Sequence, residues 1–307
     1  MFDAAGSAAF PGSEDKALFL AGFLNSKVAA QALGAINPTV NFQAWNIGNL
    51  PLNTNLIESI KLKRSLKFLH DFSELDWNSW EISWDFECLP LLTMFSETVS
   101  NLESSYSIWI AQSQNTIAEM KRLEEENNRL FIDAYGLQDE LTPEVPIEQI
   151  TLTVNPAHRY GIKGTEEEGN TRFREDTMDE LISYAIGCMM GRYSLDAPGL
   201  IYANSGNEGF DASQYTTFPA DDDGIIPLTD AEWFADDAAN RVEEFISVAW
   251  PANSETGNHL EENLDFLAAN LSPKKSESSR DTIRRYLCDK FYKDHMQTYK
   301  KRELTAA

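Results

Sequence analysis

The chain has 307 residues, of which 42% are hydrophobic, and a formal net charge of −24 at pH 7. This composition is sufficient for a sizeable core and is unlike that of a disordered chain. No run of about 18 apolar residues occurs and no secretory signal pattern is visible, so we expect a cytoplasmic protein with no membrane partner. The acidic excess argues against a free-standing nonspecific DNA-binding protein, because phosphate contacts need Lys and Arg.

The charge is uneven along the chain. Residues 1–75 hold six Lys or Arg and six Asp or Glu, so the acidic excess begins after them. Four of these basic residues form a small cluster within residues 61–67: Lys61, Lys63, Arg64 and Lys67. A solvated helix face is one interpretation of this cluster, and contact with DNA phosphates is the other.

The residues that could bind a metal ion are scattered along the sequence. The three cysteines, at positions 88, 188 and 288, form no CxxC pair, which is typical of reduced thiols and gives no zinc-site spacing. The acidic run at residues 221–223 lacks the alternate acidic positions and the closing Glu of an EF-hand loop. We therefore expect no metal site.

Residues 13–52 give the densest structural pattern. Ser13 precedes two acidic residues and an apolar run, which predicts an N-cap and a helix that continues to about Leu33. Gly34 and Pro38 then end the helix, and the alternation around Phe42 predicts a short strand. Residues 53–69 predict a second, short helix.

The middle of the chain is rich in tryptophan and then strongly helix-forming. Trp77, Trp80 and Trp84 are spaced three and four apart between acidic residues, which favours packing against the next helix over stacking on bases. Residues 91–135 contain no Gly or Pro and predict one helix of some 40 residues that Gly136 ends. Residues 150–154 (ITLTV) predict a short strand.

The last part of the chain predicts further helices at about residues 175–193, 229–248, 258–270 and 279–302. The fold class expected is therefore α+β and predominantly α-helical. We divide the chain into residues 1–75, residues 76–145 with the Trp-rich segment and long helical spacer, and a helical domain with acidic loops at residues 146–307.

Seven stretches taken together resemble one family: residues 2–11, 19–52, 75–86, 128–146, 182–203, 221–237 and 278–302. In this order they are similar to the C-terminal half of the large adenine-specific DNA methyltransferases of BREX phage-exclusion systems, the PglX family. The resemblance covers most of the chain. It implies that residues 1–75 end a mixed target-recognition domain, and that a long-helix arm and a helical C-terminal region follow.

The same resemblance implies what the chemistry would need. In that family a Rossmann-like domain binds S-adenosylmethionine through an FxGxG-type loop, and an NPPY-type motif holds the flipped adenine. No FxGxG occurs in this sequence, and its two Asn-Pro pairs, at residues 37–38 and 155–156, lack the second Pro and the aromatic residue. No catalytic or cofactor-binding residue can therefore be assigned here, and we expect this chain, as a piece truncated at both ends, to be inactive alone.

The resemblance makes residues 1–75 the part nearest to DNA. The candidate contacts are Lys27, Asn41, Gln43, Asn46, Lys61, Lys63, Arg64 and Lys67. Other expected partners are the missing methyltransferase half and further phage-defence components. Two alternatives stay open: a free-standing acidic interaction or regulatory protein that binds a basic partner, and a remnant without stable function.

Overall fold

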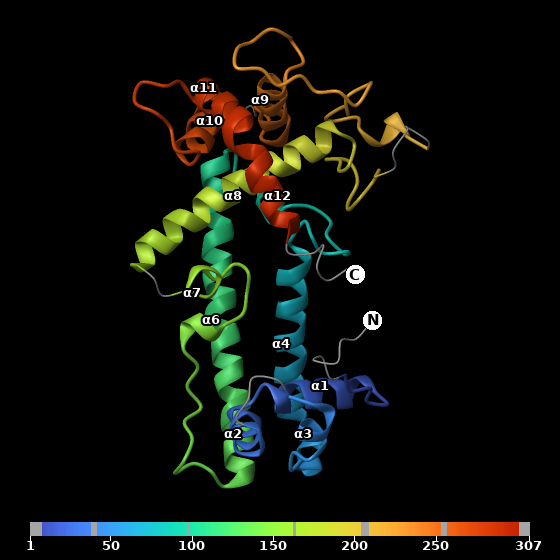
Figure 1. The fold of residues 1–307 in the computed structure, drawn as a ribbon, viewed down its shortest axis with the longest axis vertical. Coiled ribbons are helices and arrows are strands. Elements are labelled where there is room, and N and C mark those ends of the chain that lie inside the picture. The colour runs from blue at the N-terminus through green and yellow to red at the C-terminus, as the bar shows by residue number, and fades with distance from the viewer. Residues whose placement is uncertain are drawn as a thin grey trace. The chain divides into compact units, whose positions relative to one another are not determined.

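A computed structural model describes residues 8–37, 42–96, 99–161, 164–203, 209–252 and 257–300 (Figure 1). The chain divides into two compact units, each built from two separate stretches. Unit 1 comprises Met1–Asp76 and Gln114–Ile162, and unit 2 comprises Trp77–Ser113 and Lys163–Ala307. The functional division of the sequence into three segments stays a prediction.

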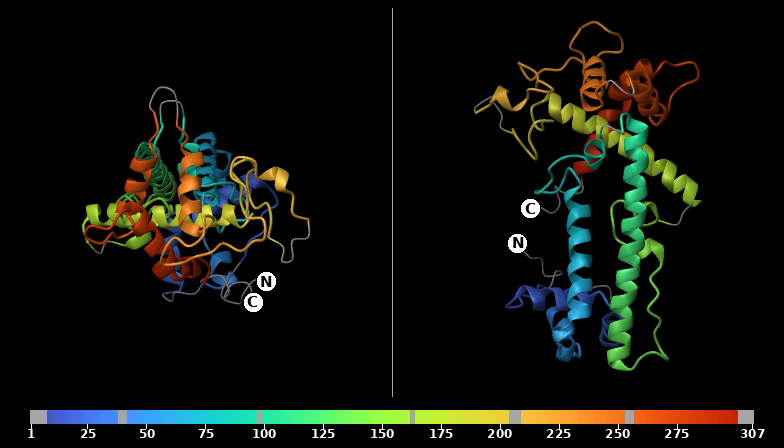
Figure 2. Two further views of the ribbon diagram at one scale, coloured as in Figure 1. Left: turned by 90° about the horizontal axis from the view of Figure 1, so that it is seen from above. Right: turned by 180° about the vertical axis from the view of Figure 1, so that it is seen from behind.

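Unit 1 is built from helices and 3-10 turns: α1 (Glu14–Leu24), α2 (Lys27–Ile36), α3 (Ala44–Gly48), η1 (Thr54–Glu58), most of α4 (Ile60–Asn78), the later part of α6 (Leu102–Tyr135), η2 (Ile147–Gln149) and α7 (Pro156–Tyr160). The first three helices lie beside one end of α4 and α6 (Figures 1 and 2). Phe19 and Phe23 of α1, Leu62 and Leu66 of α4 and Phe131 of α6 share one buried cluster. This core fixes the face of α4 that points inward.

The predicted helix over residues 13–33 is two helices with a 68° bend between them. Ser13 caps the first helix as expected, accepting a hydrogen bond from the Lys16 amide at 3.4 Å. The break comes at Ser26, a buried side chain whose Oγ donates to the Phe23 carbonyl at 2.6 Å and accepts from the Ala29 amide at 3.3 Å. Ser26 thereby ends one helix and starts the next, without the Gly or Pro that would mark a break in the sequence.

The long helix is shorter at its start than predicted. The turn α5 (Pro90–Thr93) is separate, and α6 begins at Leu102 because the Asn101 Oδ1 accepts from the Ser104 amide at 2.8 Å. The predicted end is confirmed: α6 stops at Tyr135, and Gly136 has a φ of +67°, which costs glycine little.

Unit 2 contains α5, the start of α6, α8 (Glu166–Met189), η3 (Ala212–Gln214), α9 (Ala238–Ala249), α10 (Leu260–Ala269), α11 (Ser279–Tyr286), the π-helical turn η4 (Leu287–Phe291) and α12 (Tyr292–Lys300). Its core joins Tyr184 of α8, Phe245 and Trp250 of α9 and its end, Leu264 of α10 and Tyr286 of α11. Figure 2 shows α9, α10 and α11 gathered over α8.

The predicted β component is not found. Apart from isolated bridge residues at Ser96, Val99 and Gly257, the described residues form no β-structure, so the helical part of the predicted fold class is confirmed and its strand part is not. Residues 150–154 do not pair with a strand because the Asp76 carboxylate accepts from the Thr153 amide at 2.7 Å, the Thr153 hydroxyl at 3.0 Å and the Val154 amide at 3.2 Å. Of the strand expected at Val40–Gln43, Val40 and Asn41 lie outside the described residues, and Phe42 and Gln43 are not in a strand.

Two further expectations are wrong. The helix predicted from residue 229 begins only at Ala238, where the Asp237 Oδ1 accepts from the Asn240 amide at 2.9 Å. Trp84 does not pack against a helix but is fully exposed, and Trp77 is 47% exposed. Among the described residues, no single helix is both long enough and apolar enough to cross a membrane. The helices α1 and α2 meet these two criteria only when they are taken together as a bent pair.

Candidate nucleic-acid interface

The strongest candidate for DNA contact is the outward face of α4. Leu62 and Leu66, one turn apart, point into the core of unit 1. The helix period therefore places Lys61, Arg64 and Phe68 on the solvent side, where all three are exposed. The four basic residues predicted at this site lie on one helix, and their side chains contact different partners.

Three lysines of this cluster are ion-paired. Lys61 Nζ lies 2.7 Å from Glu126 of α6, Lys63 Nζ lies 2.8 Å from Asp15 of α1, and Lys67 Nζ lies 2.9 Å from Asp71. The hydrogen bond from Lys63 to Asp15 raises the lysine pKa, and the one from Lys67 lowers the pKa of the Asp71 carboxyl. These lysine ammonium groups are solvent-accessible, so a phosphate competes with each carboxylate on similar terms.

Arg64 differs from the lysines. Within the part of the chain that the structure describes, no carboxylate lies in ion-pair range of its guanidinium, which instead sits 5.6 Å from the centre of the Phe68 ring. Phe68 in turn stacks on Phe72, with ring centroids 6.4 Å apart and an interplanar angle of 25°. Phe72 packs against the buried cluster around Met120 and Ile150. Arg64, Phe68 and Phe72 therefore form a stack in which Phe72 supports one exposed aromatic ring and the cation on it.

That stack has the chemistry of a nucleic-acid contact. A guanidinium offers a planar set of donors to a phosphate or a base edge, and an exposed aromatic ring offers a face on which a base stacks. Phe68 was not among the residues predicted from the sequence. Its signal was its position one helical turn after Arg64, which places both on one face.

The predicted contacts before α4 are positioned differently. Lys27 begins α2, and its backbone amide donates to Asn128 at 2.9 Å. Gln43 is exposed, whereas Asn46 is buried and its Oδ1 accepts from the Gln43 amide at 2.8 Å, which holds the start of α3. Asn41 lies outside the described residues. The side chain next to Asn46, Trp45, is 67% exposed and offers a second ring.

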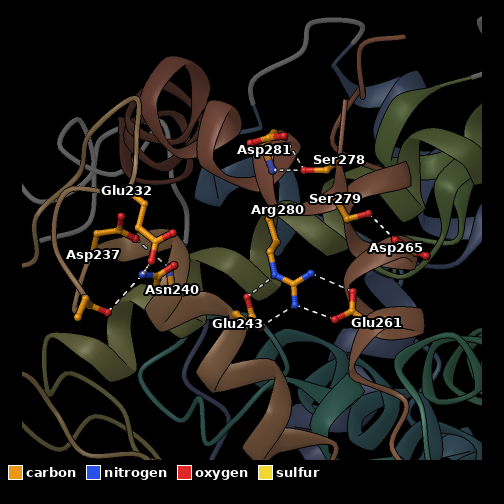
Figure 3. Close-up of polar contacts among 11 residues, drawn as sticks. Glu232, Asp237, Asn240, Glu243, Glu261, Asp265, Ser278, Ser279, Arg280 and Asp281 are labelled. Carbon is orange, nitrogen blue, oxygen red and sulfur yellow. Dashed lines mark hydrogen bonds and ion pairs between the residues drawn. The ribbon is translucent and has the colours of Figure 1, made fainter. Parts of the chain in front are cut away.

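The arginines of unit 2 are not available in the same way. Arg280 of α11 lies between two carboxylates, 2.7 Å from Glu243 of α9 and 2.8 Å from Glu261 of α10 (Figure 3). Arg284 lies 2.5 Å from the fully buried Asp237, and Arg285 lies 2.8 Å from Glu277. The pairs of Arg280 and Arg284 tie α11 to α9 and α10, so these two arginines stabilise unit 2.

Two other places among the described residues bring polar groups close together. On α4, His70, Asp71 and Glu74 place ligand atoms within 4.8 Å of one another, but Asp71 is held by Lys67. In unit 2, a cavity of about 410 Å³ has Cys88, Tyr184 and Asp196 in its walls. The Asp196 carboxylate there accepts from the Thr217 amide at 2.8 Å, which satisfies it within the protein. We assign no metal or cofactor to either.

The two units also differ in net charge. Unit 1 carries 10 Lys or Arg against 16 Asp or Glu, and unit 2 carries 15 against 33, so the net charges are −6 and −18. Phosphates are therefore repelled less by unit 1.

Comparison with known proteins gives the family. No protein-family model matches the chain. The adenine-specific methyltransferase BrxX of Escherichia coli O9:H4 (strain HS) is 39% identical over 315 residues, which cover 99% of this chain and 25% of that protein. The adenine-specific methyltransferase PglX of Lacticaseibacillus casei (strain Zhang) is 36% identical over 313 residues, 99% of this chain and 23% of that protein.

The chain spans about a quarter of the length of these relatives. The resemblance predicted from the sequence motifs is confirmed over nearly every residue of the chain, in two proteins from different bacteria. This chain is homologous to a segment of the PglX-type adenine-specific methyltransferases.

Proposed function

We propose that this chain is the DNA-recognition and scaffold portion of a site-specific adenine-N6 DNA methyltransferase of a BREX-type phage-defence system. The single observation that supports this most is the match of 99% of the chain to a quarter of two adenine-specific methyltransferases. Because the activity belongs to proteins four times as long, the catalytic step is assigned to the rest of such a protein.

We propose no S-adenosylmethionine site in this chain. A Rossmann-like site uses a parallel sheet whose first strand ends in a glycine-rich loop, and the described residues include neither that sheet nor an FxGxG sequence. The cofactor is therefore proposed for the intact enzyme only. This chain would hold DNA while another part flips the adenine and transfers the methyl group.

Within this proposal, α4 of unit 1 supplies the DNA contact. Arg64 would meet a phosphate or base edge, Phe68 would stack on a base, and the lysines would exchange their carboxylates for phosphates. Other phage-defence components are proposed as further partners, and the cytoplasm as the place of action.

The first test is a methyl-transfer assay on the purified chain with S-adenosylmethionine and bacterial DNA. We expect no N6-methyladenine by mass spectrometry, and methylation by the isolated chain would contradict the proposal. The second test is binding to a duplex of about 30 base pairs by fluorescence anisotropy at low salt. Arg64→Ala is expected to weaken binding about 5- to 20-fold and to reduce the salt slope by about 1.

The second candidate is an acidic interaction or regulatory protein that binds a basic partner. The net charge of −18 on unit 2 favours it. A chain that binds no duplex at low salt, and yet binds a basic protein in a salt-dependent manner, would replace the first proposal by this one.

A further inference from the structure

Residues 225–236, which we name the aromatic loop, combine strong exposure with strong anchoring. Within this loop Ile225 is 70% exposed, Leu228 42%, Trp233 74% and Phe234 51%. Exposed large apolar side chains that are this close in sequence, four within ten residues, point to an interaction site.

The backbone of the aromatic loop is held at several points. The Ala238 amide donates to the Pro227 carbonyl at 2.9 Å, and Arg284 Nη1 donates to the Thr229 carbonyl at 3.2 Å. Asn240 Nδ2 lies 3.3 Å from the Ala235 carbonyl and 3.2 Å from Glu232 Oε1 (Figure 3). The loop is therefore preorganised, so little conformational entropy is lost when it is buried by a partner.

The anchor is itself supported by α9, α10 and α11. Arg284 also binds the buried Asp237, the residue that caps α9, and Arg280 of the same helix joins α9 to α10 through Glu243 and Glu261 (Figure 3). The exposed side chains thus belong to a loop whose anchor is joined to three helices of unit 2 by ion pairs. This is the arrangement that presents rigid aromatic anchors to a partner.

The electrostatic surroundings of the aromatic loop restrict the partner. Residues 221–237 contain seven Asp or Glu and no Lys or Arg. Among the described residues, no basic side chain forms an ion pair with Asp230, Glu232 or Asp236. DNA phosphates, anionic lipids and a second copy of this surface all carry negative charge and would be repelled.

We propose that the aromatic loop is a docking surface for a basic polypeptide, whose Lys or Arg side chains surround a pocket that receives Trp233 and Phe234. The apolar pair provides the buried centre of the interface and the carboxylates provide its rim. This surface lies in unit 2 and is separate from the α4 residues proposed for DNA. The inference therefore stands or falls independently of DNA binding.

The test uses the full chain as bait for a displayed library of short random peptides, with the Trp233→Ala/Phe234→Ala chain as the counter-selection. Peptides that prefer the unaltered chain should be enriched in Lys or Arg together with apolar residues. For a synthetic peptide from that pool, the double variant should weaken binding by on the order of tenfold or more. The combined Asp230→Asn, Glu232→Gln, Asp236→Asn variant should weaken it less and reduce its salt dependence.

Trp84→Ala is the matched control, because Trp84 is a fully exposed tryptophan of unit 2 outside the aromatic loop. It should leave peptide binding unchanged, and thermal melts of all variants should coincide because the altered side chains are exposed. Failure to enrich any loop-dependent peptide, or enrichment of acidic peptides, would overturn the inference. Loss of duplex binding or of self-association in the double variant would also overturn it, since either would show a different occupant.

Discussion

The two units use the same residue types in opposite ways. In unit 1 the lysines of α4 make solvent-accessible pairs, Lys63 with Asp15 of α1 and Lys67 with Asp71, and Arg64 lies on Phe68. In unit 2 Arg280 and Arg284 join three helices through pairs with two or more contacts or with a buried partner. A single exposed pair exchanges its partner easily, whereas a cation that holds two carboxylates or a buried one is structural, so the number of basic residues says less about DNA binding than their pairing does.

The largest expected effect is in unit 2. Asp237→Ala removes the cap of α9 and leaves Arg284, a mostly buried cation, without its partner. We expect a loss of about 3–5 kcal/mol in the free energy of unfolding, because a buried charge without its partner is strongly destabilising. Urea unfolding followed by circular dichroism measures it. Lys63→Ala, the control in unit 1, should leave the transition where it was; an equal loss in both variants would remove the distinction between the units.

The matching test in unit 1 is Asp76→Ala. This carboxylate accepts three hydrogen bonds from Thr153 and Val154, so its removal leaves backbone amides unpaired. We expect a destabilisation of about 1–3 kcal/mol. Amide hydrogen exchange should accelerate at residues 150–154, and Asp76→Asn should recover part of the protection. Unchanged exchange in Asp76→Ala would show that Asp76 does not hold this segment.

A buried carboxyl group gives each unit a pH dependence. Burial, together with the nearby charge of Asp294, raises the pKa of Asp179 in unit 2 to about 7. The pKa is higher in the folded protein than in the unfolded chain, so stability is greatest at low pH and is lost as the pH rises through about 7. Asp179→Asn should recover about 2 kcal/mol at pH 8 and little at pH 4. A melt-midpoint difference that does not grow between these pH values would contradict this assignment.

A smaller pH dependence of stability is expected in unit 1. Burial raises the pKa of Glu124 on α6 to about 7 as well. The sign is the same, but this side chain is more accessible, so solvent screening reduces the gain from Glu124→Gln to about 1 kcal/mol at pH 8. Melts at pH 5 and pH 8 measure it. A gain larger than that of Asp179→Asn would reverse the expected order of the two units.

The sequence allowed some of this fold to be predicted. Helix content, the Ser13 cap and the end of α6 at Gly136 followed from local patterns, which act within one or two turns. The break at Ser26 did not follow, because serine is compatible with both a helix interior and a cap. The segment at residues 150–154 has a strand-like composition, but its amides bind Asp76, which lies 77 residues earlier.

The candidate site shows the same limit. The basic cluster could be found from composition, but whether each cation is paired depended on carboxylates brought close by the fold, such as Asp15 and Glu126. The late start of α9 at Ala238 left Trp233 and Phe234 exposed, although the sequence pattern placed them in a helix. In both cases long-range contacts decided what local propensity left open.

We propose that DNA meets unit 1 through α4 and does not meet the arginines of unit 2. Hydrogen–deuterium exchange of the full chain, with and without a duplex at low salt, tests it most directly because both units are read in one experiment. We predict slower exchange in α4 around residues 60–72 and unchanged exchange in α9, α10 and α11. Protection confined to α9, α10 and α11, with α4 unaffected, would contradict the account.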